Sequence, residues 1–156
     1  MEKKLPSSTK VVVIGGGVVG CSVAYHLAKF GWKDTILLER DQLTSGTTWH
    51  AAGLVSQLGP TAAVTKIRKY TLDLYKELEK KVDHSAGLRL NGALSIAQHK
   101  GRWQELQRQA TTAQLYDVDV RILDKDQIKK DYPIINTDEV IGLSLIHISE
   151  PTRRSV

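Results

Sequence analysis

The sequence predicts an α/β fold that opens with a βαβ unit, and three observations support this. Val11 to Ile14 is an unbroken run of β-branched residues, which is typical of a buried strand in a parallel sheet. Three glycines follow, and apolar side chains then recur every three or four positions up to residue 30, as in an amphipathic helix. Residues 35–38 form a second short apolar run and predict the next strand.

The elements that follow are predicted from their own local signals. The first helix, over residues 18–30, ends at Gly31 because glycine commonly stops a helix. Residues 41–60 are rich in Gly, Ser and Thr and predict a loop, with a short helix near residues 49–54. Residues 65–82 predict a long amphipathic helix, whose apolar stripe is Ile67, Tyr70, Leu74, Leu78 and Val82.

The second half predicts a β-hairpin, two helices and a further strand. Residues 88–90 and 93–97 flank the pair Asn91-Gly92, which favours a type I′ turn with two positive φ angles. A helix is expected over residues 102–116 and a strand over residues 118–123. A capping pair, Asp124 and Gln127, then opens a short helix that stops before Pro133.

Composition excludes several classes of protein. With 156 residues, 41% hydrophobic and 25% charged, the chain fits one globular domain of ordinary size. The net charge of +5 is spread along the sequence and forms no clustered basic face, so we expect no nucleic-acid partner. The longest apolar run is too short to span a membrane. The single cysteine excludes a disulfide framework and a Cys-rich metal site, and we expect no metal.

The three glycines have the spacing of a dinucleotide-binding turn, Gly15-x-Gly17-x-x-Gly20. Gly15 allows a tight turn, Gly17 lets the backbone approach a pyrophosphate, and Gly20 lets the helix pack closely. Glu39 lies nineteen residues after Gly20 and ends the next strand, where a carboxylate accepts hydrogen bonds from ribose hydroxyls and repels a 2′-phosphate. The pattern predicts a Rossmann-like fold that binds NAD or FAD. Arg40 either neutralises the phosphates or is a surface residue.

The loop after Glu39 contains small and hydroxylated residues from Thr44 to Gly53. Such residues allow a second part of a long ligand to approach the backbone, or they form a flexible surface loop. Composition alone does not distinguish the two.

Five segments closely resemble the N-terminal flavin-binding part of the dimethylglycine and sarcosine dehydrogenase family, within the amino-acid-oxidase-like flavoenzymes. They are VVVIGGGVVG (11–20), AYHLAKFGWKD (24–34), LLERDQLTSGTTWHAAGL (37–54), NGALSIA (91–97) and DYPIINTDEVIG (131–142). The resemblance covers about residues 10–142 and implies a truncated, Rossmann-like FAD-binding fold. We expect residues 1–9 to be an N-terminal tail, residues 10–142 to be part of the FAD-dependent oxidoreductase domain, and residues 143–156 to be non-native.

The resemblance also implies an activity, the oxidative demethylation of a small N-methylated amine such as dimethylglycine or sarcosine. Hydride would pass to FAD, electrons would leave to an electron-transfer flavoprotein or to oxygen, and folate would bind a separate C-terminal part. The mitochondrial matrix is the implied location, although no presequence is visible; the cytoplasm is the alternative. The histidine that matches His50 attaches FAD covalently in this family. The expected cofactor-binding residues are Gly15, Gly17, Gly20, Glu39, Arg40, Gly46, Thr47, Thr48, His50 and Gly53.

Two other functions remain open from the sequence. The regulatory subunit of pyruvate dehydrogenase phosphatase is a non-catalytic relative with the same fold, in which the stretch around the attachment histidine is altered. An NAD-binding dehydrogenase is the other. The presence of His50 in the segment Thr47-Thr48-Trp49-His50 favours the enzyme over the regulatory subunit. The catalytic residues around the substrate are not identified from this chain.

Overall fold

A computed structural model of the chain describes residues 6–83, 85, 87–146 and 150–151. The chain divides into two compact units, Met1–Ala52 and Gly53–Val156. Among the described residues, no helix has both the length and the hydropathy needed to cross a membrane.

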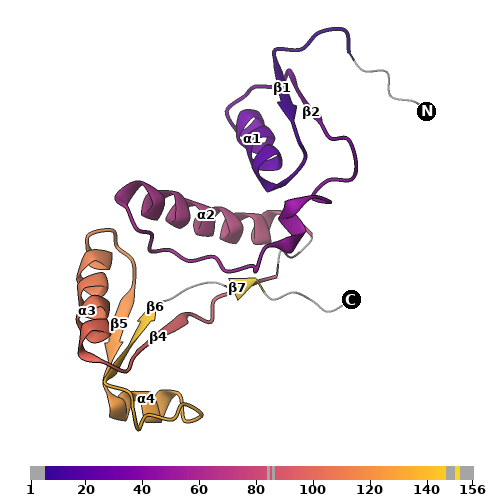
Figure 1. Ribbon diagram of the computed structural model, residues 1–156. Coiled ribbons are helices and arrows are strands. Elements are labelled where there is room, and N and C mark those ends of the chain that lie inside the picture. Colours follow the sequence, from indigo (N-terminus) through magenta and orange to yellow (C-terminus); the bar gives the residue numbers. More distant parts are fainter. Residues whose placement is uncertain (1–5, 84, 86, 147–149, 152–156) are drawn as a thin grey trace. The chain divides into compact units, whose positions relative to one another are not determined.

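The first unit contains the predicted βαβ arrangement (Figure 1). Strand β1 (Val11–Ile14) pairs in parallel with strand β2 (Thr35–Leu38), in a register that sets Val11 beside Thr35. Helix α1 (Val18–Lys29) connects the two strands and contacts both. The short helix predicted near residues 49–54 is a single 3₁₀ turn, η1 (Thr47–His50), and begins two residues earlier than expected.

Apolar side chains of the first unit are largely exposed. Ile14 on β1 is 85% exposed, and Val19 on α1 is 74% exposed. Among the described residues, β2 is the only strand paired with β1. Strands of a parallel sheet are normally buried on both faces. The apolar sequence of β1 therefore predicts a more deeply buried strand than this two-stranded sheet provides.

The second unit is built around an antiparallel sheet of three strands in the order β4-β6-β5. These are β4 (Ala93–Ala97), β5 (Val120–Leu123) and β6 (Gly142–Ile146). Helix α3 (Lys100–Gln114) contacts all three strands and contributes the fully buried Leu106. Figure 1 shows the helix beside β5. The core of this unit consists of Leu123, Ile128, Val140, Leu143 and Leu145.

Two further helices complete the second unit. Helix α2 (Ala62–Lys81) begins at Thr61, whose side chain accepts a hydrogen bond from the amide of Val64. Helix α4 (Lys125–Asp131) begins with the predicted capping box, in which Asp124 and Gln127 bond to each other's backbone amides. That prediction is confirmed, and α4 ends before Pro133 as expected.

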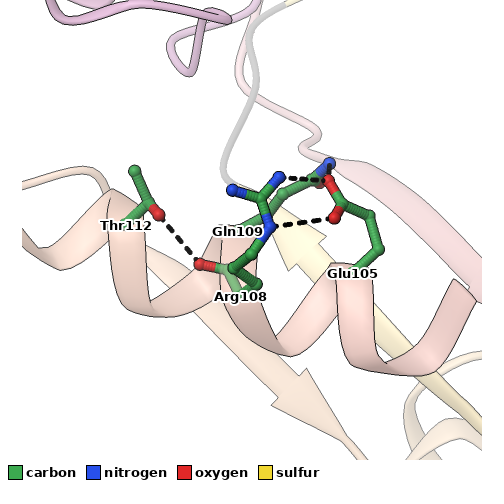
Figure 2. A network of polar contacts seen from close by, with 4 residues as sticks. All are labelled: Glu105, Arg108, Gln109 and Thr112. Atoms are coloured by element: carbon green, nitrogen blue, oxygen red, sulfur yellow. Dashed lines mark hydrogen bonds and ion pairs between the residues drawn. The ribbon is translucent and has the colours of Figure 1, made fainter. Parts of the chain in front are cut away.

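The solvent-facing side of α3 carries a small polar network (Figure 2). The Glu105 carboxylate accepts two hydrogen bonds from Arg108, at 2.8 and 3.0 Å, and one from Gln109 at 2.8 Å. The hydroxyl of Thr112 donates to the carbonyl of Arg108. Hydrogen bonding from Arg108, and then from Gln109, lowers the pKa of Glu105 below its ordinary value. Exposed pairs of this kind add little to stability.

The predicted β-hairpin is wrong. Strand β3 (Leu88–Arg89) pairs with β7 (Glu150–Pro151), whereas β4 pairs with β6. A type I′ turn needs a positive φ at both central residues. Of the two, both of which the structure describes, only Gly92 has one, at 79°. The chain therefore passes from β3 to β4 without reversing.

The predicted domain boundary after Gly142 falls within strand β6. Residues 143–146 belong to this central strand, and Leu143 and Ser144 are almost completely buried. A Cβ atom on Gly142 would lie 2.3 Å from the Trp103 ring, so α3 packs directly on the start of the strand. The sheet thus includes residues 143–146, which the sequence predicts to be part of the C-terminal tail.

Candidate functional site

A tight glycine turn joins β1 to α1. Gly15 has a φ of 101°, a conformation that residues with a side chain rarely adopt, and its amide donates to the carbonyl of Leu38 at 2.8 Å. A Cβ atom on Gly20 would lie 1.8 Å from the carbonyl oxygen of Gly15. The turn and the first turn of α1 are therefore in such close contact that no side chain fits between them.

Gly16, which sequence reasoning did not select, is the best-connected residue of the turn. Its amide donates to the Glu39 carboxylate at 2.6 Å, and its carbonyl accepts from the amide of Thr44 at 3.0 Å. The Cys21 thiol donates to the same carbonyl. A Cβ atom here would lie 2.5 Å from a methyl carbon of Leu43. The signal in the sequence was the unbroken Gly15-Gly16-Gly17 run, which has one glycine more than the dinucleotide pattern requires.

Glu39 lies directly after β2, and backbone amides hold its carboxylate. Besides Gly16, the amides of Arg40 and Asp41 donate to it, at 2.7 and 3.2 Å. The bond from Gly16, followed by that from Asp41, lowers the pKa of Glu39 below its ordinary value. The side chain is therefore an anion at neutral pH and is fixed beside the glycine turn. A carboxylate with several lone pairs can still accept hydrogen bonds from a ligand.

Thr48 links the loop after β2 to the start of α1. Its hydroxyl accepts a hydrogen bond from the amide of Val18 at 2.9 Å. The N-cap residue of the helix, Gly17, has no side chain to do so. A Cβ atom on Gly17 would lie 3.1 Å from the Thr48 hydroxyl. A residue thirty positions away in the sequence thus caps α1.

The start of α1 is suited to an anion. No described residue accepts a hydrogen bond from the next two amides of the helix, those of Val19 and Gly20. The first amides of a helix have no partner within it, and the helix dipole favours negative charge there. A turn without side chains, free helix amides and a fixed carboxylate are together the features of a dinucleotide-binding turn.

Trp49 and His50 stack on each other at the end of η1. Their ring centroids are 3.8 Å apart, and the ring planes are inclined by 31°. The Trp49 indole N–H donates to the carbonyl of Ser45 at 3.0 Å. Both residues are exposed. The imidazole is thus held on one side by an indole that is itself bonded to the loop.

The remaining predicted residues are less closely involved. Arg40 contacts Glu39 through its backbone amide, and its side chain is exposed. Gly46 is the N-cap residue of η1, and Thr47 begins that turn as an exposed residue. Gly53, with a φ of 82°, begins the second unit. The structure therefore brings Gly15, Gly17, Gly20, Glu39 and Thr48 into one place within the first unit.

Comparison with known proteins identifies the family. Residues 10–147 match the family described as "FAD dependent oxidoreductase". The chain belongs to this family. The prediction that the chain is part of an FAD-dependent oxidoreductase is confirmed. The matched residues extend five positions past the predicted boundary at Gly142.

Two relatives are similar to this chain over most of its length. It is 41% identical to mitochondrial sarcosine dehydrogenase of Homo sapiens, over 90% of this chain and 16% of that protein. It is 35% identical to mitochondrial dimethylglycine dehydrogenase of Homo sapiens, again over 90% of this chain and 16% of that protein. The predicted resemblance is confirmed. The chain spans about a sixth of the length of these relatives.

A solved structure has the same fold. The L-proline dehydrogenase of P. horikoshii superposes with a TM-score of 0.83 and 24% identity, over 94% of this chain and 39% of that one. At this identity the similarity shows the fold alone. The α/β, Rossmann-like fold predicted from the sequence is confirmed.

Proposed function

We propose that this chain is the FAD-binding part of an enzyme that oxidises a small N-methylated amine, such as sarcosine or dimethylglycine. Membership of the FAD-dependent family supports the cofactor. The names of the two relatives support the substrate class. The structural observation that carries the dinucleotide-binding part of the proposal is the Glu39 carboxylate held beside the glycine turn at 2.6 Å from the Gly16 amide.

Different residues of the first unit would bind different parts of the cofactor. The amides of Val19 and Gly20 would bind the pyrophosphate, which the helix dipole stabilises. Glu39 would accept hydrogen bonds from the ribose hydroxyls, and its charge would repel the 2′-phosphate of NADP. When bound, FAD supplies the acceptor for a hydride from the N-methyl carbon of the substrate.

We further propose that His50 attaches FAD covalently. A neutral imidazole has a nucleophilic ring nitrogen near neutral pH. His50 lies in the same four-residue turn as Thr48, which caps the helix at the proposed pyrophosphate site. Because the turn is short, the attachment residue cannot move far without breaking that cap. A covalent bond would retain the cofactor and shift its redox potential.

Three finer points of the proposal rest on the family resemblance of the sequence. We propose an electron-transfer flavoprotein or oxygen as the electron acceptor, folate bound outside this chain, and the mitochondrial matrix as the location. The two relatives are both named as mitochondrial proteins. Stopped-flow reoxidation of the reduced enzyme, with oxygen and with the flavoprotein in separate syringes, distinguishes the acceptors. Fractionation of cells that express the full-length protein tests the location.

Anaerobic titration of the purified full-length protein with candidate amines tests the function. Sarcosine or dimethylglycine should bleach the flavin absorbance, whereas the quaternary amine betaine should not, because it has no lone pair on nitrogen to expel the hydride. Bound flavin that no N-methyl amine reduces would contradict the proposed enzyme and favour the non-catalytic regulatory alternative. Binding of NAD without any bound flavin would contradict the proposed cofactor.

A further inference from the structure

We infer that Trp49 is a positioning residue for the attachment of flavin at His50. The inference rests on the covalent attachment proposed above and adds to it a residue with a defined task. Trp49 would fix the plane of the imidazole, so that a ring nitrogen at its edge meets the flavin before the bond forms.

The stacking of these two residues is not a consequence of helix geometry. In a 3₁₀ helix there are three residues per turn, so adjacent side chains leave the axis about 120° apart. The rings of Trp49 and His50 nevertheless have centroids only 3.8 Å apart. Both side chains must therefore bend towards each other. Stacked rings touch through their faces, so both nitrogens of the imidazole remain at the edge of the stack.

Burial does not explain the position of the indole either. Trp49 is 59% exposed, so it is not a core residue of the first unit. Its N–H group is instead bonded to the Ser45 carbonyl at 3.0 Å, four residues back in the same loop. A large, rigid ring with one end bonded to the backbone restricts the neighbouring imidazole to few orientations. Orienting a nucleophile in advance lowers the barrier to its reaction.

Two different contacts thus set the position of His50. The Thr48 hydroxyl, 2.9 Å from the Val18 amide, fixes the η1 turn against α1. Trp49 then fixes the orientation of the ring within that turn. Loss of the first contact would displace the whole turn, whereas loss of the second would leave the turn in place and release only the imidazole.

Attachment of the flavin to His50 is an oxidation in which bonds, protons and electrons balance. A bond forms between a ring nitrogen of His50 and the 8α carbon of the flavin, and one C–H bond at that carbon breaks. The imidazole loses its N–H proton, and the electron pair of the broken C–H bond passes into the flavin ring. Dioxygen then removes two electrons and two protons as hydrogen peroxide. Orientation of the imidazole affects the bond-forming step alone.

The rate of attachment in the full-length protein tests this inference. Apoprotein is mixed with FAD, and flavin that survives acid precipitation is measured over time. Trp49→Ala should slow attachment by about tenfold or more, as expected for a misplaced reacting group. Trp49→Phe keeps a stacking ring but loses the bond to Ser45, and should attach at an intermediate rate. Trp32→Ala is the control, because Trp32 is a half-exposed tryptophan of the same unit.

The affinity for non-covalent FAD, measured in a His50→Ala background, separates positioning from a general structural role. Addition of Trp49→Ala to that background should leave the affinity unchanged. Attachment at the normal rate in Trp49→Ala would overturn the inference, as would a loss of affinity that accounts for the slower attachment. Absence of covalent flavin in the unmutated protein is a different result, and it would overturn the proposed attachment itself.

Discussion

The two units of the chain are stabilised in different ways. In the second unit, Leu106, Leu123, Ile128 and Leu143 are each at most 1% exposed and form a packed interior. Among the described residues of the first unit, Gly16 alone is buried, and it has no side chain. The first unit is organised by short backbone contacts around the glycine turn, including those from Gly16 to Glu39 and Thr44.

Because of this difference, we expect cofactor binding and folding stability to depend on different units of the chain. The first unit has free helix amides and a fixed carboxylate, and its close contacts at Gly16 and Gly20 leave no room for a Cβ atom. The second unit gains its stability from the burial of apolar area. Substitutions in the first unit should therefore affect the cofactor, and core substitutions in the second unit should affect the free energy of unfolding.

The largest expected effect comes from an alanine in the first turn of α1. Gly20→Ala places a Cβ atom 1.8 Å from the Gly15 carbonyl oxygen, so the turn must open. We expect loss of FAD binding, measured as the flavin content of the purified full-length protein. Gly101→Ala makes the same change near the start of α3, where the closest atom would be 3.6 Å away, and should leave flavin content unchanged. Equal flavin contents in the two variants would contradict the account.

Truncation of a core side chain in the second unit should instead lower stability and leave flavin binding unchanged. Leu106→Ala removes a completely buried side chain and should cost about 2–5 kcal/mol. Hydrogen exchange of the α3 and β6 amides in the full-length protein measures this loss of local stability. Leu115→Ala, at a site that is 77% exposed, should change it by less than about 0.5 kcal/mol. Flavin affinity should be similar in both variants.

A smaller effect is expected from the charge on Glu39. Its pKa is below the ordinary value of 4.5, so the contribution of the carboxylate is complete above pH 4.5 and is lost as the pH falls through the lowered pKa. In the His50→Ala protein, where binding is reversible, FAD affinity should be constant down to that pH and should then fall. Glu39→Gln should bind more weakly and show no such fall. An unchanged pH profile in Glu39→Gln would show that another group is responsible.

Local signals in the sequence were sufficient for the βαβ unit and for the capping box of α4. In both, the residues that interact lie close together in the chain or at a spacing fixed by a known turn. The spacing from Gly20 to Glu39 likewise located a carboxylate that the structure does place beside the turn.

The hairpin prediction failed for a physical reason, because strand pairing also depends on residues far apart in the sequence. Asn91-Gly92 favours reversal, but all five residues of β4 pair with β6, whose residues 142–146 lie far along the chain. Pairing at that distance leaves no local signal. The same holds for Thr48, whose bond to Val18 spans thirty residues, and for the stacking of Trp49 on His50, which depends on the side-chain conformations and on the bond from the Trp49 indole to Ser45.

Mass spectrometry of the His50 peptide tests the proposed cofactor attachment most directly. The full-length protein is denatured in acid, washed and digested, and the peptide that contains His50 is weighed. We predict that the flavin stays with the protein and that this peptide carries its mass, whereas His50→Ala releases the flavin. Flavin that washes out of the unmutated protein, with the His50 peptide at its unmodified mass, would contradict the account.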